Sequence, residues 1–320
     1  MARFDVAFLL VPRFSMIALY GAVEPLRVAN RFAGEVFSWR FVSVDGAPVA
    51  ASNGIPVSVG GDLASLGKPT MAMVAASYEP EAGISRPMLG AIRKLARQKV
   101  QLAAIDTGPF LLAEAGVLDG YRATCHWESL PGFRESFPQV IATEALYEKD
   151  RDRLTSAGGA AAIDMMLGWI GDQMGQGLSV MVADQLIHFR NQGEQGQVRA
   201  PAQMRYATRD PRLLAVIAAM EQNMEEPLSA PQLAGHAGVS VRSMERLFRD
   251  GLRARPMGVY RRIRLERAER LLTYSHMSVR DVSLATGFST LAEFSRAFRD
   301  CYGRPPSMLR RTPGPLAKGL

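Results

Sequence analysis

The sequence predicts two domains: an α/β domain with a largely parallel sheet, followed by an all-α domain with two helix-turn-helix units. Three observations support this prediction. Apolar runs alternate with helical patterns as far as residue 189, a polar, Gly-rich stretch follows, and the last part of the chain repeats itself. We therefore expect domains at residues 1–192 and 210–320, joined by a linker at residues 193–209.

The first domain contains several continuous apolar runs, which are typical of strands buried on both faces of a parallel sheet. The strands that these runs predict cover residues 4–11, 37–44, 70–76, 100–105 and, less apolar, 153–156. Apolar residues at helical spacing predict helices at residues 16–32, 86–97, 108–115, 160–174 and 178–189. Strands that alternate with helices indicate an α/β layer fold.

The C-terminal part holds two copies of one short unit, and a shift of 50 residues relates Phe248 to Phe298. Each copy begins with a short helix that has capping-box spacing at its start. A glycine, Gly238 or Gly287, then ends that helix, and a second helix follows. Each copy therefore has the order of a helix-turn-helix unit.

The second helix of each copy has an apolar side and a polar side. In the second copy we expect the apolar stripe to consist of Leu291, Phe294, Phe298 and Cys301. Polar and basic residues face the other way, and guanidinium groups there suit guanine edges and phosphates in the DNA major groove. The DNA-contacting residues that this pattern predicts are Arg242, Ser243, Arg246, Arg249, Thr290, Ala292, Ser295, Arg296 and Arg299.

The predicted DNA-contacting residues divide into two groups. Those near the helix starts, such as Arg242 and Ala292, are expected at base edges. Arg246 and Arg296 sit at matching places in the two copies and suit either phosphates or bases. Between the copies, apolar spacing predicts a helix over residues 257–274 that packs on both units and holds them at a fixed separation.

The C-terminal pattern resembles the AraC/XylS family of bacterial transcription regulators, over residues 211–311. The residues that carry the resemblance are Arg246 and Phe248, Pro256, Tyr260, Arg264, Ala268, Leu271 and Leu272, Ala285, Gly287 and Phe288, Phe294 to Arg296, Phe298, Gly303 and Pro306. The resemblance implies promoter binding and usually activation, with RNA polymerase as a further partner.

The distribution of charge agrees with a DNA-binding protein, and the cysteine content excludes two kinds of site. The net charge is +7, and residues 210–320 carry all of this excess, since the first 209 residues hold 20 basic and 20 acidic side chains. Two cysteines are too few for a disulfide framework or a Cys-rich zinc site, so we expect no metal and no cofactor. We also expect no signal peptide, no membrane span and a cytoplasmic location.

The N-terminal part resembles the flavodoxin-like DJ-1/PfpI, or class I glutamine amidotransferase-like, domain. The residues that carry this second resemblance are Leu102 to Gly116, Leu118 to Gly120, Ala123, Thr124, His126 and Trp127, and Thr155 to Gly159. Such a domain joined to an AraC-type module is typical of regulators of arginine, glycine betaine and carnitine metabolism. In the enzymes of this superfamily a cysteine nucleophile stands at a sharp strand-to-helix turn, and here the corresponding residue is Asp106.

Asp106 therefore predicts a domain that binds a ligand without converting it, because a carboxylate is a poor nucleophile. The ligand-binding residues that we expect are Glu24, Asp106, Thr107, His126 and Trp127. Two carboxylates and an indole suit a small amine or quaternary ammonium ion. An alternative is that Asp106 only caps the following helix, because Asp is a favoured N-cap residue.

Together these features predict a ligand-responsive transcription regulator that binds promoter DNA as a homodimer. Two other functions remain open. One is an active DJ-1/PfpI-type hydrolase fused to a DNA-binding module, and the other is a constitutive regulator whose N-terminal domain only dimerises.

Overall fold

The computed structural model describes residues 4–188, 206, 208 and 210–309. The chain divides into two compact units, Met1–Val198 and Arg199–Leu320. The predicted linker at residues 193–209 lies outside the described residues, except for Tyr206 and Thr208. Among the helices formed by residues 4–188 and 210–309, none combines the length and the apolar composition of a transmembrane segment.

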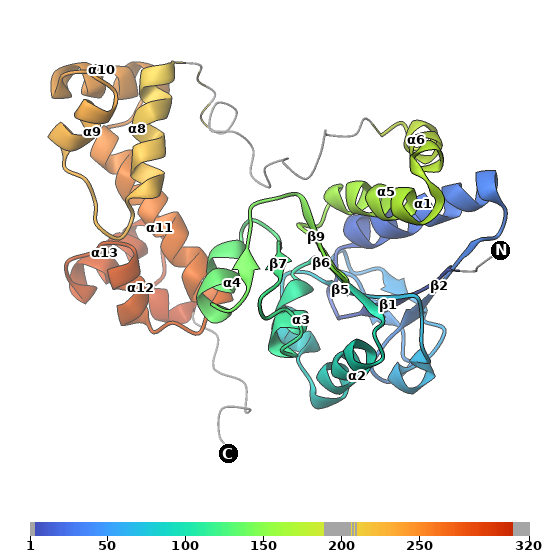
Figure 1. The fold of residues 1–320 in the computed structure, drawn as a ribbon. Coiled ribbons are helices and arrows are strands. Elements are labelled where there is room, and N and C mark those ends of the chain that lie inside the picture. Colours follow the sequence, from blue (N-terminus) through green and yellow to red (C-terminus); the bar gives the residue numbers. More distant parts are fainter. Residues whose placement is uncertain (1–3, 189–205, 207, 209, 310–320) are drawn as a thin grey trace. The chain divides into compact units, whose positions relative to one another are not determined.

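The N-terminal unit is built on a six-stranded sheet with the order β2-β1-β5-β6-β10-β9 (Figure 1). Its strands are β1 (Phe4–Leu10), β2 (Phe37–Val42), β5 (Met71–Ala76), β6 (Gln101–Asp106), β9 (Tyr147–Asp150) and β10 (Arg153–Ser156). Neighbouring strands are parallel except for the pair of β9 and β10. The predicted largely parallel sheet is thus confirmed, and an unpredicted antiparallel strand is added at one edge.

Helices cover both faces of this sheet (Figure 1). On one face lie α1 (Met16–Ala33), α5 (Ala161–Met174) and α6 (Gln176–Gln185), and on the other lie α2 (Arg86–Arg97) and α3 (Pro109–Glu114). The side chains of α1, α5 and α6 form one apolar core with the strands. The helix α4 (Leu130–Ser136) and two short strand pairs were not predicted; these pairs are β3 (Val49–Ala50) with β4 (Pro56–Val57), and β7 (Arg122–Ala123) with β8 (Ile141–Ala142).

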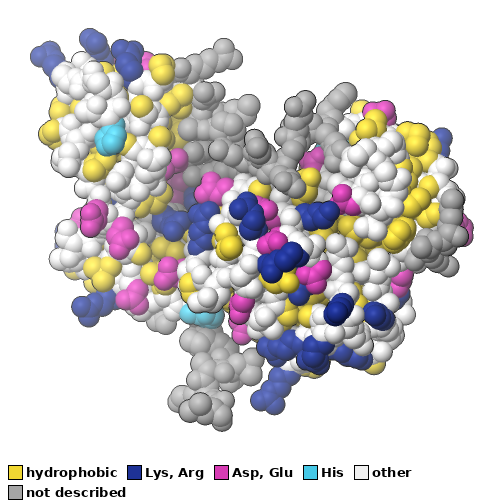
Figure 2. Space-filling model, in the orientation of Figure 1, with side chains coloured by type: hydrophobic (Ala, Val, Ile, Leu, Met, Phe, Trp, Pro, Cys, Tyr) yellow, Lys and Arg dark blue, Asp and Glu magenta, His cyan; other side chains and the backbone are white. Residues whose placement is uncertain are grey.

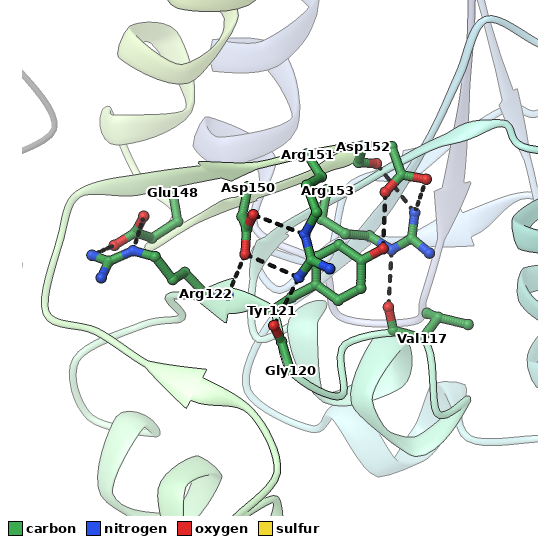
Figure 3. A network of polar contacts seen from close by, with 9 residues as sticks. All are labelled: Val117, Gly120, Tyr121, Arg122, Glu148, Asp150, Arg151, Asp152 and Arg153. Carbon is green, nitrogen blue, oxygen red and sulfur yellow. Dashed lines mark hydrogen bonds and ion pairs between the residues drawn. The ribbon is translucent and has the colours of Figure 1, made fainter.

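A network of polar contacts fixes the antiparallel edge of the sheet (Figure 3). Arg151, at the turn between β9 and β10, has a φ of 54° and lies over the ring of Tyr121, 3.5 Å from its centre. The guanidinium group of Arg153 approaches the same ring to 4.9 Å and donates a hydrogen bond to the carbonyl of Val117. These contacts hold the start of β10, whose other end reaches the turn at Asp106.

The C-terminal unit is helical, as predicted (Figure 1). Its helices are α8 (Pro211–Gln222), α9 (Ala230–His236), α10 (Val241–Leu252), α11 (Pro256–Tyr274), α12 (Val279–Ala285) and α13 (Leu291–Tyr302). The pair of α9 and α10 forms the first helix-turn-helix unit, and the pair of α12 and α13 forms the second. Ser278 and Asp281 at the start of α12 exchange the two hydrogen bonds of a capping box.

Within the C-terminal unit, the two helix-turn-helix units have separate apolar cores, and α11 contributes to both. Tyr260 and Ile263, in its first half, belong to the core of the first unit. Leu265, Ala268, Leu271 and Leu272, in its second half, belong to the core of the second. The prediction that this helix packs on both units is therefore confirmed.

Polar contacts reinforce this arrangement at the turn of the second unit. Arg264 of α11 donates hydrogen bonds to the carbonyls of Thr286 (2.7 Å) and Gly287 (2.9 Å). Its guanidinium carbon also lies 4.2 Å from the centre of the Phe288 ring. Gly287 in turn touches the segment before α9, because a Cβ atom at residue 287 would lie 2.5 Å from the carbonyl oxygen of Met224.

We expect Gly287→Ala to destabilise the C-terminal unit more than Gly238→Ala does. Both glycines have left-handed backbones, with φ of 69° and 63°, and each alanine should cost about 1 kcal/mol for that reason. Only Gly287 adds a clash with Met224, which should cost about 1–3 kcal/mol more. Circular dichroism of the full chain during denaturation measures the difference.

Tryptophan fluorescence provides the control for this experiment. All three tryptophans, Trp39, Trp127 and Trp169, lie in the N-terminal unit, so their unfolding transition should be the same in both variants. Equal destabilisation by the two substitutions would contradict the assigned close contact.

Candidate effector site and DNA-contacting surface

Asp106 lies at a tight turn between β6 and α3. Its φ of 63° is in the left-handed region, which residues other than glycine seldom occupy. Glycines make room for the turn: a Cβ atom at Gly158 would lie 2.7 Å from the Cβ atom of Asp106, and one at Gly108 would lie 2.5 Å from the carbonyl oxygen of Val74. Asp106 therefore lies at a sharp strand-to-helix turn, which is where the enzymes of the resembled superfamily carry their cysteine nucleophile.

The alternative prediction that Asp106 caps the following helix is wrong. The N-cap of α3 is Gly108, whose residue type provides no side chain for capping, and Pro109 occupies the first helical position. Asp106 precedes the N-cap by two residues, and its carboxyl accepts hydrogen bonds from the Ser77 hydroxyl and the backbone of Thr107. The carboxylate of Asp106 therefore does not cap α3.

Burial dominates the electrostatics of Asp106, which is only 7% exposed. Burial and the negative charge of Glu128 raise the pKa of its carboxyl to about 7, against hydrogen bonds from the Ser77 hydroxyl (3.3 Å) and the backbone of Thr107. Within the described residues, no positively charged side chain is among the groups that act on it. A carboxylate in such surroundings favours a cationic partner.

Three of the predicted ligand-binding residues surround this turn. The hydroxyl of Thr107 donates to the carbonyl of Ser77 (2.6 Å), and the backbone N–H of His126 donates to the carbonyl of Asp106 (3.0 Å). Partial burial lowers the pKa of His126, which Glu128 opposes. The half-buried Trp127 stacks obliquely on His126, with ring centres 5.8 Å apart.

Glu24 occupies a different environment from the one predicted. Its carboxylate accepts two hydrogen bonds from Arg27, one turn further along α1. Its described contacts do not include Asp106, and the acidic charge that acts on Asp106 comes from Glu128 instead. Ser77 and Glu128 are thus the site residues that the sequence reasoning missed. The position of Ser77 directly after strand β5 was the available signal, since the ends of parallel strands meet at one edge.

Cys125 lies near the turn but has the wrong properties for a nucleophile. It is fully buried, and burial together with the charge of Asp106 raises the pKa of its thiol well above the ordinary value. The thiol therefore stays protonated at neutral pH, whereas reactive cysteines are thiolates. In the described part of the chain, no cluster of three or more His, Cys, Asp or Glu side chains is arranged to hold a metal ion.

The second helix of the first unit, α10, presents a basic face. Arg242, Arg246 and Arg249 are exposed, whereas Met244 and Phe248 are buried in the core. Ser240 caps the helix by accepting the N–H of Ser243 at 3.2 Å. Figure 2 shows Lys and Arg side chains, in dark blue, standing out from the surface where Figure 1 places α10.

The second helix of the second unit, α13, repeats this plan. The buried side chains are Phe294, Ala297 and Phe298, and the predicted DNA-contacting residues that are exposed are Thr290, Ala292, Arg296 and Arg299. Thr290 is the N-cap and accepts the N–H of Glu293 at 3.1 Å. Ser295 is half-buried.

Parts of the predicted apolar faces are wrong. Cys301 is exposed, because the neighbouring Tyr302 is the residue that packs against the second core at this end of α13. Leu291, at the start of the same helix, is 46% exposed, and Met257 on α11 is 44% exposed. The apolar stripe of α13 therefore consists of Phe294, Ala297 and Phe298, with the partly buried Tyr302 packed against the same core at the end of the helix.

We expect Asp106→Asn to stabilise the N-terminal unit more at pH 8 than at pH 5. The folded-state pKa of about 7 lies above the unfolded value of 3.8, so the folded chain holds its proton longer and stability falls as pH rises between these values. Asparagine removes this cost, which is on the order of 4 kcal/mol above pH 7. Urea unfolding followed by tryptophan fluorescence measures the gain.

The matched control is Asp119→Asn, an exposed aspartate in the same unit. It should shift the midpoint little at either pH. Equal stabilisation by Asp106→Asn at both pH values would show that the carboxyl is not buried as described.

Comparisons with known families and proteins find matches for both domains of the chain. The DJ-1/PfpI family matches residues 6–171, and a helix-turn-helix domain family matches residues 233–312. The HTH-type transcriptional regulator CdhR of Pseudomonas aeruginosa is 43% identical over 306 residues, which cover 96% of this chain and 91% of CdhR. The regulator GbdR of the same species is 37% identical over 303 residues, covering 94% of this chain and 83% of GbdR.

A solved structure agrees with these matches. The crystal structure of an AraC family transcriptional regulator from Pseudomonas putida is 29% identical, with a TM-score of 0.54, and covers 57% of this chain and 99% of its own. The family matches thus place a DJ-1/PfpI domain and a helix-turn-helix domain in one chain, which agrees with the relatives' names as HTH-type or AraC family regulators. The chain therefore belongs to the HTH-type transcriptional regulators that join a DJ-1/PfpI domain to an AraC-type DNA-binding domain.

Proposed function

We propose that this DNA-binding transcription regulator senses a small cationic metabolite at the turn that holds Asp106. The observation that carries the proposal is a buried carboxyl, held in a strained backbone conformation, whose pKa is raised by burial and by Glu128, with no positively charged side chain of the described residues among the groups that act on it. In open α/β folds, ligands bind beyond the carboxyl ends of the parallel strands, which is where Asp106 lies. A bound cation would supply a positive charge to pair with the Asp106 carboxylate.

The neighbouring side chains favour an amine or a quaternary ammonium ion. The half-buried indole of Trp127 could add a cation–π contact of about 0.5–2 kcal/mol. Because its pKa is lowered, His126 is mostly neutral at pH 7 and does not repel a cation. Glu128 adds negative charge close enough to act on Asp106.

We propose further that this domain binds its ligand without converting it. A carboxylate at the turn is a poor nucleophile, and the buried Cys125 is held as a thiol. Binding would shift the protein between two arrangements of its DNA-binding domains, within a homodimer that contacts RNA polymerase and activates transcription in the cytoplasm. A fused hydrolase, the second candidate, would need another nucleophile.

We expect Arg242→Ala and Arg296→Ala to weaken DNA binding, because both side chains are exposed on the second helices of the two units. A variant that loses a phosphate contact should also show a salt slope smaller by about 1, whereas one that loses a base contact should change the preferred sequence. Fluorescence anisotropy with promoter DNA at several salt concentrations separates the two cases. Arg97→Ala, which removes an exposed positive charge from α2, is the control. Unchanged affinity in both variants at matched salt would contradict the assigned surface.

We expect a cationic effector to raise the melting temperature of the full chain, as followed by tryptophan fluorescence. The panel contains arginine, other amines, glycine betaine, carnitine and choline, with acidic and neutral compounds as controls. A ligand at a hundred times its dissociation constant should add about 2.7 kcal/mol. Its affinity should rise as pH increases through about 7, because Asp106 must lose its proton to pair with a cation.

The Asp106→Asn variant tests the role of the carboxylate in this response. It should bind the cation more weakly and without the pH dependence, while its affinity for DNA stays the same. Shifts with acidic or neutral compounds alone would mean that the site is misassigned. No shift with any compound would favour the regulator whose N-terminal domain only dimerises.

A further inference from the structure

The helices α10 and α13 can be compared residue by residue. A shift of 50 residues relates them, and each has an N-cap hydroxyl, from Ser240 in α10 and Thr290 in α13. The buried positions also correspond, since Phe248 and Phe298 are both fully buried. Equivalent residues therefore project in equivalent directions from the two helix-turn-helix units.

The second and third turns of the two helices carry the same charges. Arg246 corresponds to Arg296, Arg249 corresponds to Arg299, and all four side chains are exposed. These shared arginines suit a task that is common to both units, such as contact with the phosphate backbone.

The first turns differ in charge. The exposed Arg242 of α10 corresponds to the exposed Ala292 of α13, and the half-buried Ser243 corresponds to the exposed Glu293. The first turn of α10 therefore presents a positive guanidinium group. The first turn of α13 presents a methyl group and a negative charge.

The first turns differ in apolar exposure as well. Val241 of α10 is half-buried and packs against the core of the first unit. Its counterpart Leu291 is 46% exposed, and it is not among the residues that form the second core. An exposed leucine thus directly precedes Ala292 in the first turn of α13.

The start of a recognition helix is the part that contacts base edges in helix-turn-helix proteins. An arginine there binds the O6 and N7 acceptors of guanine, whereas apolar side chains contact the methyl group of thymine. A glutamate cannot donate to guanine. The two first turns therefore suit different bases.

We propose that the two units read chemically different DNA segments. Arg242 of α10 selects guanine in one segment, and Leu291 with Ala292 of α13 selects thymine through its methyl group in the other. The proposal rests on the DNA-contacting surface proposed above, and it adds which bases each unit selects.

The test begins with duplexes that the full-length protein selects from a random library. Affinities for the selected site are then measured at one fixed salt concentration, with thymine replaced by uracil or guanine by 7-deazaguanine in one segment at a time. Loss of one contacted methyl group should weaken binding roughly fourfold, in one segment only. Loss of the guanine N7 acceptor should weaken it about tenfold, in the other segment only.

Variants assign each segment to its unit. Leu291→Ala should abolish the sensitivity to uracil, Arg242→Ala should abolish the sensitivity to 7-deazaguanine, and Ala292→Arg should create a preference for guanine in the thymine segment. Because Leu291 and Ala292 are exposed, their variants should melt like the wild type. Segments that respond alike, or a selected sequence that Ala292→Arg leaves unchanged, would overturn the proposal.

Arg296→Ala distinguishes the two ways in which this proposal could fail. If Arg296→Ala weakens binding but the two segments respond alike, the surface is right and the difference between the units is wrong. If neither Arg296→Ala nor Arg242→Ala weakens binding, the DNA-contacting surface itself is wrong.

Discussion

The C-terminal domain depends on one helix that contributes to two apolar cores. Tyr260 and Ile263 of α11 belong to the first core and Leu265 and Ala268 to the second, so neither unit can move along α11 without losing buried contacts. Arg264, between these two sets, is bonded to the turn of the second unit. A rigid separation is what allows two recognition helices to enter successive turns of one duplex.

In the N-terminal domain the corresponding constraint is the backbone turn at Asp106. The left-handed conformation persists because the surroundings fix it: Gly108 and Gly158 leave room for the chain, and hydrogen bonds from Ser77 and His126 hold the carboxyl and the carbonyl of Asp106. Strained residues of this kind concentrate at functional sites. The turn therefore keeps a strained backbone at the end of β6, although the side chain that it holds is a carboxylate and not a strong nucleophile.

Periodic apolar residues made most of the fold predictable, and polar details were predictable only in part. The helix at Pro256–Tyr274 follows from its apolar spacing, whereas the strand Tyr147–Asp150 is an edge strand rich in charged residues and has no apolar run to mark it.

The position of Asp106 at the end of a strand was predictable, and Pro109 already indicated that the helix cap lies at Gly108. The pairing of Glu24 with Arg27 was also readable from their spacing. The influence of Glu128 on Asp106 was not, because it depends on how a loop folds back.

The energetics of Asp106 bear directly on the proposed sensing role. An ionised carboxylate that is buried without a cation destabilises the folded chain, and this cost is present at neutral pH because its pKa is about 7. A ligand that brings a positive charge removes the cost when it binds, so part of its binding free energy comes from relieving the empty site. The free energies of the empty and occupied domains then differ more than they would at a neutral site. Such a difference is what a ligand needs in order to shift a protein between two arrangements.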